Sequence, residues 1–113
     1  MNWTERQKKY PKSIVLIKKW LHLKLDKEGD FGLNQISKLF HTERRLFDFF
    51  DGEGIYIGLD YHYAIGVERW FSMSITWDVG YVKKPLKTGI RTEAEEVAFL
   101  KAFEILEQRE NEK

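Results

Sequence analysis

The chain has 113 residues, and its 19 Lys and Arg residues nearly balance its 18 Asp and Glu residues, so its formal net charge is +1. No stretch approaches the roughly 20 apolar residues of a transmembrane helix, and the absence of cysteine excludes a disulfide scaffold and a thiolate zinc site. Aromatic residues make up 15% of the chain and provide material for a core. We therefore expect a single domain over residues 1–113, cytoplasmic, without a signal peptide and without a membrane partner.

Charge is unevenly distributed along the chain. Residues 1–25 contain seven basic residues and one acid, whereas residues 93–113 contain seven acids and three basic residues. Two solvated helix faces of opposite charge would account for this pattern. Alternatively, residues 1–12 form a basic N-terminal arm, in which Lys8, Lys9 and Lys12 meet phosphates or an acidic partner.

Helical periodicity is clear near both ends of the chain. Apolar residues recur at helical spacing over 13–26, with basic residues on the opposite arc, which predicts an amphipathic helix. Residues 92–108 predict a second helix, whose broad apolar stripe is typical of a helix that packs on a sheet. Thr92 and Glu95 have the spacing of a capping box, so we expect Thr92 to be the N-cap of this helix.

Between these helices the pattern changes to strict alternation. Residues 55–65 and 70–78 alternate with period two, and 81–84 predict a short edge strand. The first two strands would each have one apolar face and one mixed face. The aromatic and aliphatic side chains expected in the core are Tyr61, Phe71, Ile75, Trp77, Phe99 and Phe103.

The segment before the first of these strands fits two interpretations. In one, residues 45–50 form a strand that enters a hairpin loop rich in Asp and Gly, and this loop chemistry favours the interpretation. In the other, 33–40 and 43–50 form two short helices, because their apolar residues also have helical spacing. We prefer the hairpin, which extends the antiparallel sheet over 45–84.

The predicted fold is α+β, with the element order α-β-β-β-α. An antiparallel sheet of three or four strands would carry two helices on one face. The opposite face, which we call the outer face, would be partly solvated. The outer-face residues expected to meet a partner are Tyr56, His62, Trp70, Ser72 and Thr76.

The chain shows no motif for catalysis or metal binding. A catalytic nucleophile needs a base within hydrogen-bond reach, and the three His residues are scattered. Asp60 and His62 could lie on one strand face, but such a pair is more often simply solvated. Neither metal ligands at zinc-site spacing nor a phosphate-binding glycine motif occurs. We expect no enzymatic activity, no catalytic residue, no metal and no cofactor.

Residues 33–50 resemble the helix-turn-helix motif of bacterial repressors. Ser37 stands at the small-residue position of that motif, although His41 stands where the turn usually has glycine. The resemblance implies DNA binding, with Arg44 and Arg45 reaching the DNA.

A second resemblance is to the double-stranded-RNA-binding domain, which has the order helix, three strands, helix. The C-terminal helix is similar to the KKxAK start and alanine-rich continuation of that family's last helix. The residues that carry this similarity are 91–95, Ala98, Ala102 and Leu106. The resemblance implies a similar fold, but Thr92 and Glu95 replace two phosphate-binding lysines, so RNA binding is not expected.

Residues 47–55 and 92–107 resemble small uncharacterised proteins of phages and mobile elements. That resemblance implies a non-enzymatic accessory protein, which could inhibit a host or defence protein. With the aromatic and polar outer face, it predicts a small protein-interaction module with a protein partner, or a homodimer through that face. The alternative is nucleic-acid binding, through 33–50 or through the basic N-terminal residues.

Overall fold

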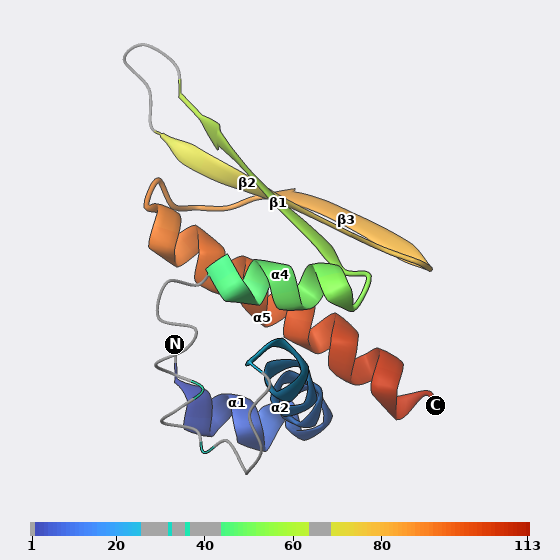
Figure 1. The fold of residues 1–113 in the computed structure, drawn as a ribbon. Helices are drawn as coiled ribbons and strands as arrows, with labels where there is room; N and C mark the ends of the chain where they lie inside the picture. Colours follow the sequence, from blue (N-terminus) through green and yellow to red (C-terminus); the bar gives the residue numbers. More distant parts are fainter. Residues whose placement is uncertain (1, 26–31, 33–35, 37–43, 64–68) are drawn as a thin grey trace. The chain divides into compact units, whose positions relative to one another are not determined.

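The computed structural model describes residues 2–25, 32, 36, 44–63 and 69–113 (Figure 1). Within these residues it has four helices and an antiparallel sheet of three strands, which confirms the α+β class. The elements in chain order are α1 (Trp3–Lys9), α2 (Pro11–Leu25), α4 (Arg44–Gly52), β1 (Tyr56–His62), β2 (Trp70–Trp77), β3 (Gly80–Pro85) and α5 (Arg91–Asn111).

The chain divides into two compact units. Met1–Phe49 and Phe103–Lys113 form the first unit, and Phe50–Ala102 forms the second. Helices α1 and α2 belong to the first unit and the whole sheet belongs to the second. Helices α4 and α5 contribute residues to both units.

Helix α1 lies within residues 1–12, the segment expected in one interpretation to be a basic N-terminal arm. The Asn2 side chain caps the helix, because its Oδ1 accepts the Glu5 N–H at 3.2 Å. Buried aromatic rings hold the helix in the first unit. The Trp3 ring meets the Phe103 ring edge-on, with centroids 6.2 Å apart, and the Tyr10 ring stacks on Phe103 at 5.7 Å. A short basic segment therefore becomes ordered through two aromatic contacts that its charge does not reveal.

Helix α2 begins at Pro11, two residues before the predicted start, and ends near the predicted end. Its first N–H groups are satisfied by a side chain far away in the sequence. The Glu107 carboxylate accepts the Lys12 N–H at 3.1 Å, and the Ser13 N–H and Ser13 hydroxyl, both at 2.9 Å. Glu107 is only 8% exposed. A buried carboxylate of α5 thus caps α2, where the helix dipole favours an anion.

Helix α4 contradicts the preferred strand over 45–50 and agrees with the alternative helix over 43–50. Leu46, Phe49 and Phe50 are all buried, at the i, i+3, i+4 spacing of one helix face. Arg45 and Asp48 are exposed. Burial of this face requires helical periodicity, which a strand with period two cannot provide.

The Asp-Gly-Glu-Gly loop that suggested a hairpin is instead the C-terminal cap of α4. The Ile55 N–H donates to the Phe50 carbonyl at 2.9 Å, and the Gly54 N–H donates to the Asp51 carbonyl at 3.0 Å. Gly54 has φ +77°, the left-handed conformation that this Schellman motif requires. Glycine serves both hairpin turns and helix caps, so the loop chemistry alone did not distinguish them.

Helix α5 covers the predicted 92–108 but begins at Arg91 and extends to Asn111. The prediction that Thr92 is the N-cap is wrong, because Thr92 lies inside the helix. Thr88 takes part in the capping instead: its hydroxyl accepts the Ile90 N–H at 3.1 Å and donates to the Glu93 carboxylate. Glu95 forms an ion pair with Arg91 at 2.9 Å.

The three predicted strands are confirmed within the described residues. Strands β1 and β3 flank the central strand β2, and the two-residue turn at 78–79 joins β2 to β3. On the apolar face, three of the β2 side chains are buried. They are Phe71, Met73 and Ile75.

Four of the six predicted core side chains are buried, namely Phe71, Ile75, Phe99 and Phe103. The prediction is wrong for Tyr61, which is 45% exposed, and Trp77 is only half-buried. Tyr61 lies on β1, which among the described strands is at the edge of the sheet, so a side chain there has a neighbouring described strand on one side only. Alternation identified the face correctly but could not show which strand is central.

Replacing Glu107 tests the cap between α5 and α2. In Glu107→Gln an amide NH₂ faces N–H donors and the negative charge is lost, so we expect the free energy of unfolding to fall by about 2 kcal/mol. Urea denaturation followed by circular dichroism measures this loss. Glu112→Gln makes the same change at an exposed position and should leave stability unchanged. Equal urea midpoints for the two variants would contradict the role of Glu107.

Replacing Gly54 tests the C-terminal cap of α4. A Cβ at Gly54 meets no atom within 4 Å, so the only penalty of Gly54→Ala is its positive φ. We expect a loss of about 1 to 2 kcal/mol. Gly32 also has open space around its Cβ position but no positive φ. Gly32→Ala is therefore the matched control, and thermal unfolding should separate the two variants.

Candidate functional site

The sheet register places all five predicted partner-binding residues on one face. Tyr56 pairs with Thr76, and His62 pairs with Trp70. Ser72 lies between them on β2, at the alternate positions that share this face. The outer face expected from alternation is thus assembled from residues of β1 and β2, and Figure 1 shows these two strands side by side.

One end of the outer face is a cluster of three side chains. His62 Nε2 is 2.8 Å from the Ser72 hydroxyl oxygen, and the His62 ring stacks on the Trp70 indole with centroids 5.1 Å apart and planes 16° apart. Ser72 is buried and the two rings are half-buried. Sequence reasoning missed this contact because His62 and Ser72 lie in different strands, and only the pairing register brings them together. Alternation had already placed both on the same face.

A serine hydroxyl bonded to an imidazole is also the arrangement of a nucleophile and its base. Catalysis would require the hydroxyl to meet a substrate and a third group to orient the imidazole. Here Ser72 is covered, and the imidazole is held by its stack on Trp70. Asp60, the other residue considered for chemistry, is exposed and pairs with Ser72 through the backbone. The observed contacts therefore fix the orientation of Trp70 and join β1 to β2.

The other end of the outer face carries two exposed tyrosines. Tyr56 of β1 is 57% exposed and Tyr81 of β3 is 61% exposed. Both pair with Thr76 of the central strand, so the two rings stand on either side of a small residue. The strands they belong to are about 10 Å apart, twice the spacing of neighbouring strands. Sequence reasoning missed Tyr81, although its place in the predicted edge strand was a usable signal.

Two small residues and a lysine occupy the middle of the outer face. Gly58, Ser74 and Lys83 form one row across the three strands. A Cβ on Gly58 would lie 2.7 Å from the Ser74 hydroxyl oxygen, so glycine leaves room for that hydroxyl. The face therefore has large rings at its ends and hydroxyl groups along β2, and it combines apolar contact area with hydrogen-bonding groups.

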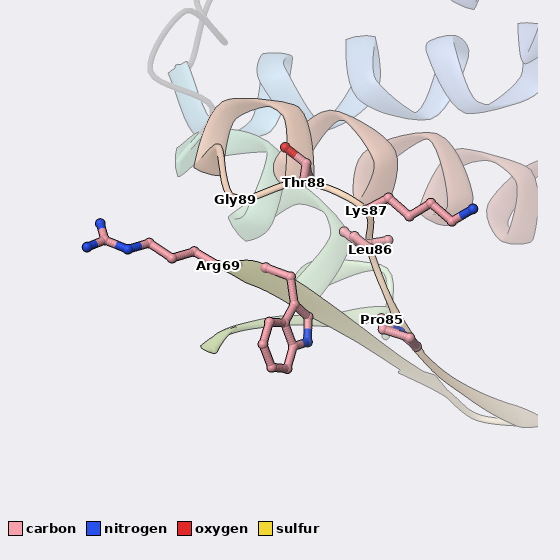
Figure 2. A pocket seen from close by; sticks show the side chains of 7 residues that line it. Arg69, Pro85, Leu86, Lys87, Thr88 and Gly89 are labelled. Carbon is pink, nitrogen blue, oxygen red and sulfur yellow. The ribbon is translucent and has the colours of Figure 1, made fainter. Parts of the chain in front are cut away.

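Trp70 also borders a hollow of about 790 Å³ where β2 meets the loop after β3 (Figure 2). The Phe71 N–H donates to the Thr88 carbonyl at 2.9 Å, and a Cβ on Gly89 would lie 2.8 Å from the Arg69 carbonyl oxygen. The side chains of Arg69 and Lys87 extend to opposite sides of this loop. The lining residues are Arg69, Trp70, Pro85, Leu86, Lys87, Thr88 and Gly89.

The basic residues proposed for nucleic-acid binding lie in the first unit. Lys8 and Lys9 are exposed in the last turn of α1, and the Lys9 ammonium lies 5.7 Å from the Tyr10 ring centroid. Lys12 is exposed at the start of α2, and its Nζ donates to the Glu110 carbonyl at 3.4 Å. Lys9 and Lys12 therefore already have contacts within the protein.

The arginines of the helix-turn-helix resemblance lie at the start of α4. Arg45 is exposed, and Arg44 is the first residue of the helix, with its side chain outside the described residues. The predicted first helix at 33–40 also lies outside them, except for Ile36, which is buried. The structure thus describes one of the two helices of that motif.

Among the described residues, no group of three or more His, Asp or Glu side chains could hold a metal ion. No helix in the same part of the chain is long and apolar enough to cross a membrane. The comparisons with protein-family models, curated proteins and solved structures found no match to this chain.

Removing the Ser72 hydroxyl tests the cluster at the end of the outer face. Ser72→Ala leaves His62 without this hydrogen bond, so we expect a stability loss of about 1 kcal/mol and a change in the fluorescence of Trp70. Ser74→Ala removes a hydroxyl from the same face of β2 and is the control. If both variants behave alike in urea and in fluorescence, the hydrogen bond does not organise the cluster.

Proposed function

We propose that this protein is a small, non-enzymatic protein-interaction module that binds its partner through the outer face of the sheet. The observation that carries the proposal is the presence of Tyr56, Trp70 and Tyr81, one from each strand, on a single sheet face. Tyrosine and tryptophan are enriched in the centres of protein interfaces, where they contribute a large share of the binding energy.

The construction of the face supports this role. A sheet holds its side chains on a rigid backbone, so few conformations are lost when a partner binds. Trp70 is further fixed by its stack on His62, and the hydroxyl groups of Ser74 and Thr76 provide hydrogen-bonding partners between the rings.

The biological setting follows from the resemblance at 47–55 and 92–107 to small phage and mobile-element proteins. A module of that kind, acting in the cytoplasm, would inhibit a host or defence protein by occluding one of its surfaces. The partner surface would be amphipathic, with apolar area opposite the rings and hydrogen-bonding groups opposite the hydroxyls of β2.

The test is a triple variant, Tyr56→Ala with Trp70→Ala and Tyr81→Ala. We expect the variant to keep its far-ultraviolet circular dichroism spectrum but to lose the proteins that the tagged wild type captures from a bacterial lysate. Loss of each central aromatic should weaken binding by about 2 kcal/mol, or roughly 30-fold. Val79→Ala, at a turn residue that is 84% exposed, is the control. A triple variant that still captures the same proteins would rule out this face.

Nucleic-acid binding is the second candidate, because residues 44–52 are helical, as a helix-turn-helix requires. The test is a gel-shift assay with duplex DNA at low and at higher salt. Binding driven by phosphate contacts should weaken steeply as salt rises. Two multiple variants distinguish the candidate DNA-binding regions. The double variant Arg44→Ala, Arg45→Ala removes the arginines of the helix-turn-helix motif. The triple variant Lys8→Ala, Lys9→Ala, Lys12→Ala removes the N-terminal lysines, and the variant that loses the gel shift identifies the region that binds. Absence of any shift at low salt would exclude this function.

A further inference from the structure

Strand β1 has an edge to which no strand of the described part of the chain is paired, because the sheet order is β1-β2-β3. The direction of the backbone groups along this edge follows from a hydrogen bond at the far side of β2. The Leu86 N–H donates to the Phe71 carbonyl at 2.7 Å, so the backbone groups of Phe71 point toward the β3 side. These directions alternate along an antiparallel strand, so Ser72 and Ser74 turn their groups toward β1.

The partners of those two serines identify the open groups of β1. Ser72 pairs with Asp60 and Ser74 pairs with Gly58, so these β1 residues bond to β2. The alternate residues Ile57, Leu59 and Tyr61 therefore turn their N–H and C=O groups to the open edge. Such a row of groups is a template for an additional strand.

The same three residues leave apolar side-chain area uncovered. Ile57 and Leu59 are half-buried and Tyr61 is 45% exposed, although all three are on the apolar face. Their β2 neighbours on that face are fully buried. The edge therefore combines open backbone groups with apolar side chains, and an added strand would cover both.

The opposite edge of the sheet has features that prevent pairing. By the same alternation, the open groups of β3 belong to Tyr81, Lys83 and Pro85. Proline has no N–H to donate, and two copies joined at Lys83 would bring like charges together. Lysine and proline are the residues that natural edge strands use against unwanted pairing. Strand β1 has neither of them between Tyr56 and His62.

The sequence of β1 is complementary to itself in one register. In an antiparallel pair centred on Leu59, Ile57 of one copy lies opposite Tyr61 of the other, and the two Leu59 residues lie opposite each other. On the other face Tyr56 lies opposite His62, and Asp60 lies opposite Gly58 rather than another acid. The pairs at 57, 59 and 61 are those with open backbone groups, so this register forms about six hydrogen bonds.

We propose that this protein forms a two-fold symmetric dimer in which β1 pairs antiparallel with β1 of a second copy, centred on Leu59. The two sheets become one continuous sheet of six strands. A two-fold axis perpendicular to that sheet keeps both outer faces on the same side. This inference rests on the edge of β1 and is independent of the function proposed for the outer face.

Oligomeric state in solution tests the dimer. We expect the wild type to be dimeric in analytical ultracentrifugation, and Leu59→Lys to weaken association by roughly 100-fold or more, because two lysines would face each other. Leu59→Glu should do the same, and an equimolar mixture of the two variants should restore a dimer. Tyr81→Lys, at an open position of β3, should leave the dimer intact.

Three results would overturn the proposal. The first is a wild type that stays monomeric from about 1 µM to about 1 mM, a range that covers weak association. The second is a dimer lost in Tyr81→Lys but kept in Leu59→Lys, which would place the contact elsewhere on the sheet. The third is a mixture of the Lys and Glu variants that associates no better than either alone, with both variants folded by circular dichroism.

Single cysteine variants test the register even if the charged variants do not fold. The chain has no cysteine, so each variant has one thiol. Cα atoms in hydrogen-bonded antiparallel pairs are about 5.5 Å apart, which is within disulfide range. Under mild oxidation Leu59→Cys should cross-link with itself. Ile57→Cys and Tyr61→Cys should cross-link with each other when mixed and not alone. The exposed Val79→Cys measures random collision, and cross-linking of Leu59→Cys at that rate would contradict the dimer.

Discussion

The first unit depends on the hydrogen bonds that the Glu107 carboxylate accepts. It accepts two backbone N–H groups and a hydroxyl from Lys12 and Ser13, and so completes the N-terminus of α2 with a side chain of α5. The residue before Pro11 is Tyr10, whose side chain is stacked on a ring and does not cap the helix. Without a local cap, α2 begins where a buried anion is available, and this requires α5 to be in place.

One turn before Glu107, the Phe103 ring contacts the rings of Trp3 and Tyr10. The end of α5 thus holds both α1 and α2, through aromatic contacts and through a charge-assisted cap. These contacts join residues about 95 positions apart in the chain. They explain why a basic segment that has no core-forming pattern of its own becomes a helix.

In the second unit the pairing register has the same organising role. It aligns His62 with Trp70 and Tyr56 with Thr76, and it decides which backbone groups of β1 bond to β2 and which remain open. The proposed partner surface and the proposed dimer edge are therefore two consequences of one register. Side chains at even positions of β1 form the outer face, and the backbone of the odd positions forms the open edge. In the proposed dimer the two outer faces lie on one continuous sheet, so a partner could meet both.

Alternation and helical spacing in the sequence determined the α+β class, the three strands, the two long helices and the face on which side chains of the first two strands lie, because these depend on periodicity along the chain. Tertiary structure decided the rest. Whether Gly54 ends a helix or turns a hairpin depended on burial of Leu46, Phe49 and Phe50, which only packing provides. Whether Tyr61 is core or edge depended on strand order, and the contact of His62 with Ser72 depended on register. Each is a relation between segments distant in the chain, and a local pattern carries no information about the partner it will meet.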